Sequence, residues 1–295
     1  MRSLPVLYSI TNTHTNPDSL PGFSFLRPSA VMVNFANRFP GFVRHWISAR
    51  SRFRIHSPFV YDFVSSVLPH RLSPEGNRIS GLRRIFLQRT ESIPIQDFGA
   101  GYGGYKQAKT SKSLAEIARS SARKRRSGEL MFRILRHYHP QNCLELGTNM
   151  GFSALYQMSG FPDAKFTTVE GSGTLAEIAR SNFKSFGFDP RIILSGFLPA
   201  IDELSASGEK FDFILLDGHH EQDATIKYFQ NLIPICNPGA CIVIDDINWS
   251  GGMRKAWKKI SAMEEVSVKM DLYSMGICFV KRPQAKESFK LRFWG

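Results

Sequence analysis

The stretch CLELGTNMGFSALY, residues 143–156, decides the fold of this chain of 295 residues. A short apolar segment leads into a turn with two glycines, Gly147 and Gly151, and a helical pattern follows from Ser153. Strand, glycine turn and helix in this order are the first half of a β-α-β unit. Glycine lets the backbone bend sharply and come close to a ligand. The stretch therefore predicts the first strand and the ligand-binding turn of an α/β sheet.

The alternation of strand and helix continues through the rest of the chain. Further strands are expected at residues 165–169, 191–194, 211–216 and 240–244. The intervening helices are expected at residues 174–185, 224–232 and 252–260. This alternation predicts a doubly wound, mostly parallel sheet. Residues 266–272 and 277–280 are expected to form a final hairpin, which adds an antiparallel strand at one edge of the sheet.

Carboxylates mark the ends of most of the predicted strands. They are Glu145, Glu170, Asp217 and the pair Asp245 and Asp246. In an open α/β sheet, ligands bind beyond the carboxyl ends of the strands, where the strand order reverses. A phosphate site there is expected to offer backbone amides with Lys or Arg instead. Acids beside glycines favour a ligand that is cationic or rich in hydroxyl groups, and Glu170 is placed to bind a ribose.

Residues 141–281 resemble the class I S-adenosylmethionine-dependent methyltransferases. The stretch at 143–156 is similar to the first motif of that superfamily, and TTVEG, residues 167–171, to the second. FDFILLDGHH (211–220) and CIVIDDINWS (241–250) resemble the small-molecule O-methyltransferase branch. IHSPFVYDFV (55–64), DFGAG (97–101) and DDINWSGGMRKAW (245–257) resemble an uncharacterised bacterial subgroup. The resemblance implies a Rossmann-like sheet of seven strands, mostly parallel, with a reversed last strand.

The resemblance also implies which residues bind S-adenosylmethionine. Glu145 and the Gly147–Gly151 turn hold the methionine end of the cofactor, and Glu170 binds its ribose. The full set of expected contacts is Glu145, Gly147, Thr148, Gly151, Ser153, Glu170, Gly171, Gly196, Phe197 and Asp217. Phe197 could stack on the adenine or belong to the core.

Metal-dependent members of this branch carry Asp at the end of the fourth strand, Asp-Asn at the end of the fifth, and a catalytic Lys. Asp217, Asp245 and Asp246 occupy the three ligand positions here, and His220 occupies the Lys position. Three oxygen donors could hold a hard cation such as Mg²⁺. An imidazole titrates near neutral pH, so His220, with Asp217, is the expected catalytic group that takes a proton from the acceptor. An exposed loop pair of His219 and His220, and an Asp246 that only caps a turn, are the structural alternatives.

The first half of the chain is strongly basic. Residues 1–140 hold 22 Lys and Arg against 7 Asp and Glu, whereas the remainder holds 16 against 18. We expect residues 1–31 to be disordered, residues 32–127 to form a basic helical extension or lid, and residues 128–295 to form the methyltransferase domain. Arginines among aromatic residues, such as Arg44 beside Trp46, are typical of an RNA-binding surface and equally of a solvated helical face.

A second glycine-rich stretch, DFGAGYGG at residues 97–104, also mimics a cofactor turn. A basic helical stretch follows it, without the strand and acid that a cofactor site requires. A structural turn, or a loop over the real site, is therefore the preferred interpretation.

The sequence as a whole predicts methyl transfer from S-adenosylmethionine to an oxygen of a small molecule. An RNA methyltransferase that uses the basic first half is one alternative, and a non-catalytic S-adenosylmethionine-binding protein is another. A dehydrogenase is disfavoured because the first turn lacks G-x-G-x-x-G spacing. No apolar run approaches the roughly 18 residues of a membrane span. The four cysteines show neither zinc nor disulfide spacing, so we expect buried thiols in a cytoplasmic protein, which could form a homodimer.

Overall fold

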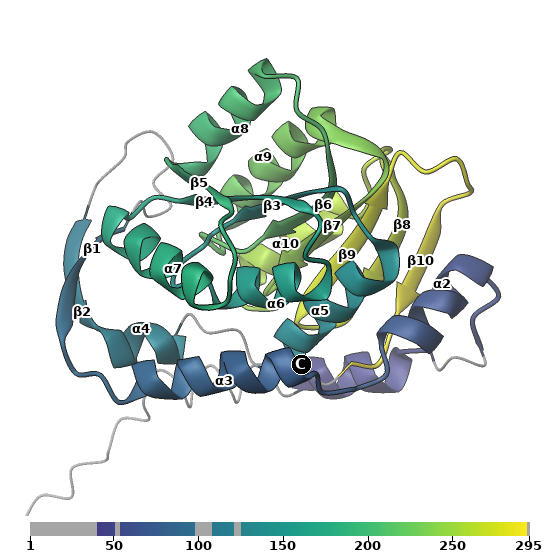
Figure 1. Ribbon diagram of the computed structural model, residues 1–295. Helices are drawn as coiled ribbons and strands as arrows, with labels where there is room; N and C mark the ends of the chain where they lie inside the picture. Colours follow the sequence, from purple (N-terminus) through teal and green to yellow (C-terminus); the bar gives the residue numbers. More distant parts are fainter. Residues whose placement is uncertain (1–39, 51–53, 98–107, 121–124, 294–295) are drawn as a thin grey trace, which may run out of the picture. The chain divides into compact units, whose positions relative to one another are not determined.

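The computed structural model describes residues 40–50, 54–97, 108–120 and 125–293 (Figure 1). The chain divides into two compact units, Met1–Asn37 and Arg38–Gly295, and every described residue belongs to the second. The expected disorder of residues 1–31, and the glycines of the 97–104 stretch, lie outside the described residues. Within the described ranges, no helix combines the length and the apolar character needed to cross a membrane.

The second unit is built on a sheet of eight strands. Their bounds are β3 (Asn142–Leu146), β4 (Lys165–Glu170), β5 (Arg191–Leu194), β6 (Phe211–Leu216), β7 (Cys236–Asp245), β8 (Val266–Asp271), β9 (Met275–Val280) and β10 (Glu287–Lys290). Their order is β10-β8-β9-β7-β6-β3-β4-β5. Strand β3 pairs in parallel with both β4 and β6, so the strand order reverses beside β3. That reversal is the switch point at which α/β sheets bind ligands.

The predicted doubly wound, mostly parallel sheet is confirmed, with two corrections. The sheet has eight strands where seven were expected, because β10 adds to the far side of β8 in parallel. The antiparallel strand is β9, and it lies between β7 and β8 instead of at the edge. A buried Phe289 secures the short edge strand β10 against the core.

Helices cover both faces of the sheet (Figure 1). One face carries α5 (Arg125–Tyr138), α6 (Phe152–Gly160) and α7 (Gly173–Ser185); the other carries α8 (Phe197–Ala206), α9 (Gln222–Leu232) and α10 (Gly251–Ile260). Neighbouring residues of a strand alternate between the two apolar layers. In β6, Phe213 packs in the first layer and Ile214 in the second. Burial on both faces explains the apolar run at residues 213–216 of that strand.

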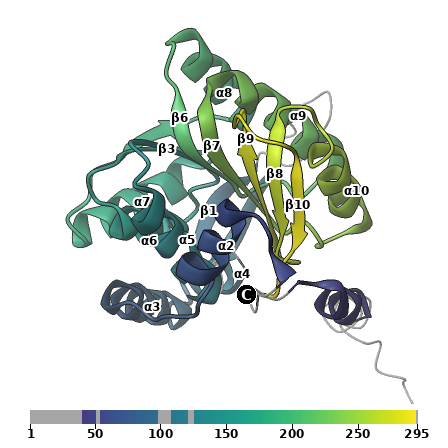
Figure 2. The same ribbon diagram turned by 90° about the vertical axis from the view of Figure 1, so that its right-hand side faces the viewer.

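The elements before α5 are a helix over residues 40–48, α2 (Pro58–Asp62) with a π-helical continuation at Phe63–Val67, α3 (Pro74–Leu87), the antiparallel pair β1 (Ser92–Asp97) and β2 (Ala108–Ser113), and α4 (Leu114–Ser120). From α2 to α4 they add an outer layer on the first face, whereas the helix over residues 40–48 lies apart from that layer. Figure 2 shows α3 and α2 beside the helices of that face. Phe63 and Ile79 are buried in the same core as α5. The described part of residues 32–127 contains helices, and it also contains the β1–β2 hairpin, which the sequence did not predict.

Candidate active site

The turn between β3 and α6 brings three strand ends together. Its φ angles are +107° at Gly147, +50° at Asn149 and +81° at Gly151, all in the left-handed region that favours glycine and tolerates asparagine. The amide of Gly147 donates to the carbonyl of Val169 at the end of β4, at 3.0 Å. On the other side, a Cβ at Gly147 would overlap the carbonyl oxygen of Asp217, the residue after β6. The backbone of this turn is therefore closely packed between its neighbours.

Glu170, the last residue of β4, holds the turn through its carboxylate. Its Oε2 accepts from the amide of Asn149 at 2.7 Å, and its Oε1 accepts from the amide of Ser172 at 2.9 Å. The side chain is half-buried. Glu170 is thus oriented by the backbone that follows β3 and β4. Its expected contact with a ribose stays a prediction.

A buried polar network lies beneath the turn and includes three of the predicted cofactor residues. Glu145 is 0% exposed, and it accepts from the hydroxyl of Ser153 at 2.6 Å and from Gln157 Nε2 at 2.8 Å. Its other oxygen accepts from Thr168 Oγ1 at 2.8 Å, and that hydroxyl lies 2.6 Å from the hydroxyl of Thr148. The expected contact of Glu145, Thr148 and Ser153 with a cofactor stays a prediction; in the structure their side chains are buried in this network. They support the turn from below.

An aromatic cluster forms the side of the site next to β6. The ring of Phe197, at the start of α8, lies against Gly147 and Gly218. It meets His219 edge-on, with ring centroids 5.1 Å apart, and Tyr228 at 5.3 Å. The hydroxyl of Tyr228 lies 2.8 Å from His219 Nδ1. Phe197 is therefore half-buried, and its ring faces the strand ends.

The sequence analysis missed Tyr228, which lies on α9. Its contact with His219 arises only when the helix folds back over β6, and no local pattern indicates that. The sequence suggested His219 only as one half of an exposed loop pair. In the structure this contact holds its ring, and its backbone has φ of +60°.

His220 lies between two of the predicted acidic residues. Its Nε2 is 3.9 Å from a carboxylate oxygen of Asp217 and 3.9 Å from one of Asp246. These are ion-pair distances for a protonated ring and too long for hydrogen bonds. The imidazole is 31% exposed, and the half-exposed ring of Trp249 lies on its other side, with centroids 6.4 Å apart. His220 is therefore open to a small molecule and surrounded by negative charge.

The residues present do not fit the predicted Mg²⁺ site at Asp217, Asp245 and Asp246. The part of the chain that the structure describes contains no group of three or more His, Cys, Asp or Glu side chains arranged to hold a metal ion. The His220 imidazole occupies the space between Asp217 and Asp246 instead.

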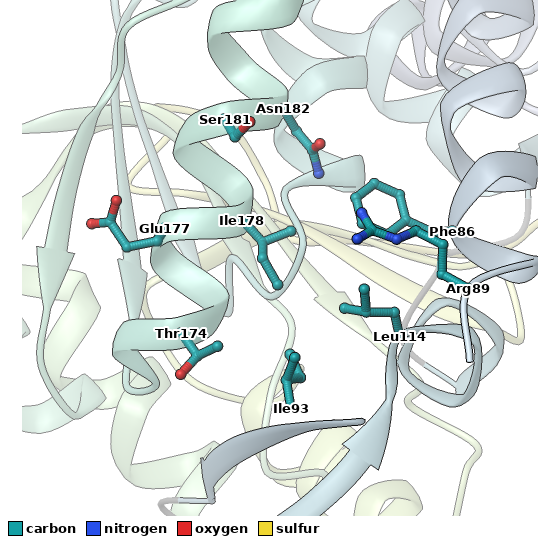
Figure 3. Close-up of a pocket in the computed structure, with 9 residues that line it drawn as sticks. All are labelled: Phe86, Arg89, Ile93, Leu114, Thr174, Glu177, Ile178, Ser181 and Asn182. Carbon is teal, nitrogen blue, oxygen red and sulfur yellow. The ribbon is translucent and has the colours of Figure 1, made fainter. Parts of the chain in front are cut away.

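A hollow of about 530 Å³ lies away from the strand ends, between α7 and the outer layer (Figure 3). It is lined by Phe86, Arg89, Ile93, Leu114, Thr174, Glu177, Ile178, Ser181 and Asn182. None of the predicted site residues lines it. Asn182 connects it to the turn, since its amide donates to the carbonyl of Met150 at 2.8 Å.

Comparison with known proteins identifies the family of this chain. A family model described as O-methyltransferase matches residues 108–273. The chain is 33% identical over 116 residues to a catechol O-methyltransferase of Mycobacterium tuberculosis, an alignment that covers 38% of this chain and 51% of that enzyme. It is 23% identical over 180 residues to a caffeoyl-CoA O-methyltransferase of Stellaria longipes, covering 53% of this chain and 74% of that enzyme. The chain thus spans about half the length of the first of these relatives.

A solved structure shows the same fold. It is the O-methyltransferase TomG from Streptomyces achromogenes, involved in tomaymycin synthesis and in complex with S-adenosylmethionine. It aligns with a TM-score of 0.51 and 18% identity, over 75% of this chain and 96% of that one. The resemblance found in the sequence motifs is confirmed, because the family model spans more than half of the chain, across the turn and the strand ends. The chain belongs to the O-methyltransferase family.

Proposed function

We propose that this protein binds S-adenosylmethionine and transfers a methyl group to a hydroxyl oxygen of a small molecule. The observation that carries the proposal is the position of His220, between the carboxylates of Asp217 and Asp246 at the end of the sheet where the cofactor turn lies. The names of the catechol and caffeoyl-CoA relatives support a small acceptor with a hydroxyl group.

The residues around the turn fit the cofactor. Glu170 accepts the ribose hydroxyls, since its carboxylate is oriented by two backbone amides. The turn from Gly147 to Gly151 binds the methionine end through its backbone, whose shape depends on both glycines because a side chain would meet the carbonyl of Asp217 at the first and the ring of Phe183 at the second. Phe197, with Gly196 before it, and Gly171 line the adenine side. The side chains of the buried network (Glu145, Thr148, Ser153) act by holding the turn in shape.

The acceptor side has to orient a hydroxyl group and remove its proton. When bound, S-adenosylmethionine supplies a methyl group on a positively charged sulfur. Nε2 of His220 takes the proton of the acceptor hydroxyl, and the carboxylates of Asp217 and Asp246 favour the imidazolium that results. General-base catalysis of this kind contributes about 10²–10⁴-fold in rate, and fixed positioning contributes about 7–11 kcal/mol in favourable cases.

Calorimetry tests the cofactor assignment directly. We expect S-adenosylmethionine and its demethylated product to bind the wild-type protein, and Glu170→Gln to weaken both by about 10–100-fold, the range of one lost hydrogen bond to a charged group. Glu177→Gln is the matched control, since that side chain is 74% exposed on α7 and serves no part of the turn. Absence of binding by the wild type would remove the proposal.

Methyl transfer is tested by mass spectrometry with S-adenosylmethionine and a panel of catechols and hydroxycinnamates. Methylated product from at least one of them is the expected result. A protein that binds the cofactor yet methylates no member of the panel would instead favour the non-catalytic alternative.

A further inference from the structure

The helix at residues 40–48 is fastened to the turn between β8 and β9. In Figure 2 it is the purple helix at the lower right. The ring of Phe42 meets the ring of Tyr273 edge-on, with centroids 5.2 Å apart, and His45 packs on the same ring at 5.5 Å. Tyr273 has φ of +69°, so its backbone is held in a conformation that non-glycine residues rarely adopt.

A single carboxylate joins the helix to the turn. His45 is 6% exposed, and its Nε2 donates to the carbonyl of Leu291 at 3.1 Å. Its Nδ1 lies 3.5 Å from Oδ1 of Asp271. The same Oδ1 accepts from the amide of Tyr273 at 2.9 Å. The carboxylate of Asp271 therefore contacts the helix through His45 and the backbone of the turn through Tyr273.

The turn between β8 and β9 also holds the loop at residues 246–249, which forms the proposed acceptor side of the site. The carbonyl of Tyr273 accepts from Nδ2 of Asn248 at 2.8 Å. Asn248 lies between Asp246, whose carboxylate faces His220, and Trp249, whose ring lies beside it. Asp246 has φ of +53°, so this loop also depends on its surroundings for its shape.

We propose that the helix at residues 40–48 positions the acceptor-side loop through Tyr273 and Asn248, and that Asn248 is a positioning residue for methyl transfer. This inference rests on the proposed function. The cofactor side is held differently, by Glu170 and the amides of its own turn. Loosening the helix should therefore reduce methyl transfer and leave cofactor affinity unchanged.

Hydrogen exchange tests the connection without any need for turnover. Phe42→Ala removes the contact with Tyr273, and Ile47→Ala is its control on the same helix, 75% exposed. We expect Phe42→Ala to speed amide exchange in residues 246–252 at least about fivefold, with residues 147–151 unchanged and Ile47→Ala without effect. Faster exchange confined to residues 40–50 would overturn the proposal.

Kinetics test the role of Asn248. Asn231→Ala is the matched control, since its amide donates to the carbonyl of Lys227 within α9. With 3,4-dihydroxybenzoate as the probe acceptor, we expect Asn248→Ala to lower kcat/KM for the acceptor at least about tenfold, with an unchanged KM for S-adenosylmethionine. An equal loss in both variants, or an equal rise in both KM values, would show a merely structural role. If the wild type does not methylate this probe, the exchange experiment alone decides the inference, so failure of the proposed function remains distinguishable.

Discussion

The backbone of Gly147 lies so close to the carbonyl oxygen of Asp217 that no side chain fits between them. Gly147 begins the turn after β3, and Asp217 is the first residue after β6. The amide of Asp217 also donates to the carbonyl of Leu146 at 3.0 Å, which holds the two strand ends in register. The turn proposed to bind the cofactor and the loop proposed to bind the acceptor thus meet through these two backbone contacts.

We expect Gly147→Ala to destabilise the fold by about 2–4 kcal/mol. A Cβ there meets backbone that cannot move aside, and the residue has φ of +107°. Gly208→Ala is the control, because φ is +75° but nothing lies within 4 Å of its Cβ position. Urea unfolding measures both changes, and strain alone should cost Gly208→Ala about 1 kcal/mol. Equal losses of unfolding free energy in Gly147→Ala and Gly208→Ala would show that the contact with Asp217 is not tight.

His220→Asn should lower the rate of methyl transfer by about 10²–10⁴-fold, since it removes the proposed base while keeping a polar side chain. Cofactor affinity should not change. His137→Asn controls for the loss of a histidine that faces an aspartate, because His137 Nε2 lies 2.7 Å from Asp62 Oδ2 in the outer layer. Single-turnover assays with a catechol measure the rate. Activity retained in His220→Asn would place the base elsewhere.

Much of the sheet could be predicted because its strands are buried on both faces. Runs such as FDFILL at residues 211–216 are typical of strands that are covered by helices on both faces. Strand β10 could not be predicted. It has one well-buried side chain, Phe289, and its pairing with β8 is known only from the folded chain. Strands β1 and β2 also carry weak signals, with a proline in one (Pro94) and the polar run AKTSKS in the other.

The sequence predicted at which strand ends the candidate site lies more reliably than which side chains contact one another there. Glu170 does end its strand, and its carboxylate reaches the turn, as expected. Glu145 lies one residue before the end of its strand, which runs to Leu146 as expected, and it pairs across from Thr168 and Leu215 inside the sheet. Its hydrogen bonds with Ser153 and Thr168 depend on tertiary packing, which no local pattern indicates. The contact of His219 with Tyr228 depends on tertiary packing alone.

The buried thiol of Cys236 makes the free energy of unfolding depend on pH. Burial raises the pKa of the Cys236 thiol from 9.0 to about 12. The native state therefore keeps a proton that the unfolded state loses, so this stabilisation is complete below pH 9 and falls as the pH rises towards 12. Between pH 8 and pH 10, in reductant, the wild type should lose about 1 kcal/mol more than Cys236→Ala in urea unfolding. Identical pH dependences would mean that the thiol is accessible in the native state.

Glu145 provides the sharpest test of how the turn is supported. Its carboxylate is fully buried and accepts hydrogen bonds from Ser153, Gln157 and Thr168. Glu145→Gln keeps the shape but replaces an acceptor by a donor, which leaves one of the donors facing it without an acceptor. We expect the free energy of unfolding, measured in urea without cofactor, to fall by about 1.5–3 kcal/mol.

The matched control is Glu203→Gln, whose carboxylate pairs with Arg191 at the surface, where ion pairs contribute about 0–1 kcal/mol. Calorimetry on the same variants should show that Glu145→Gln also weakens S-adenosylmethionine binding, because the turn above the network loses its support. The reverse combination, an unchanged stability with weaker binding, would mean that Glu145 touches the cofactor after all. In that event the turn would have to open to expose it, since in the structure no part of this side chain reaches the surface.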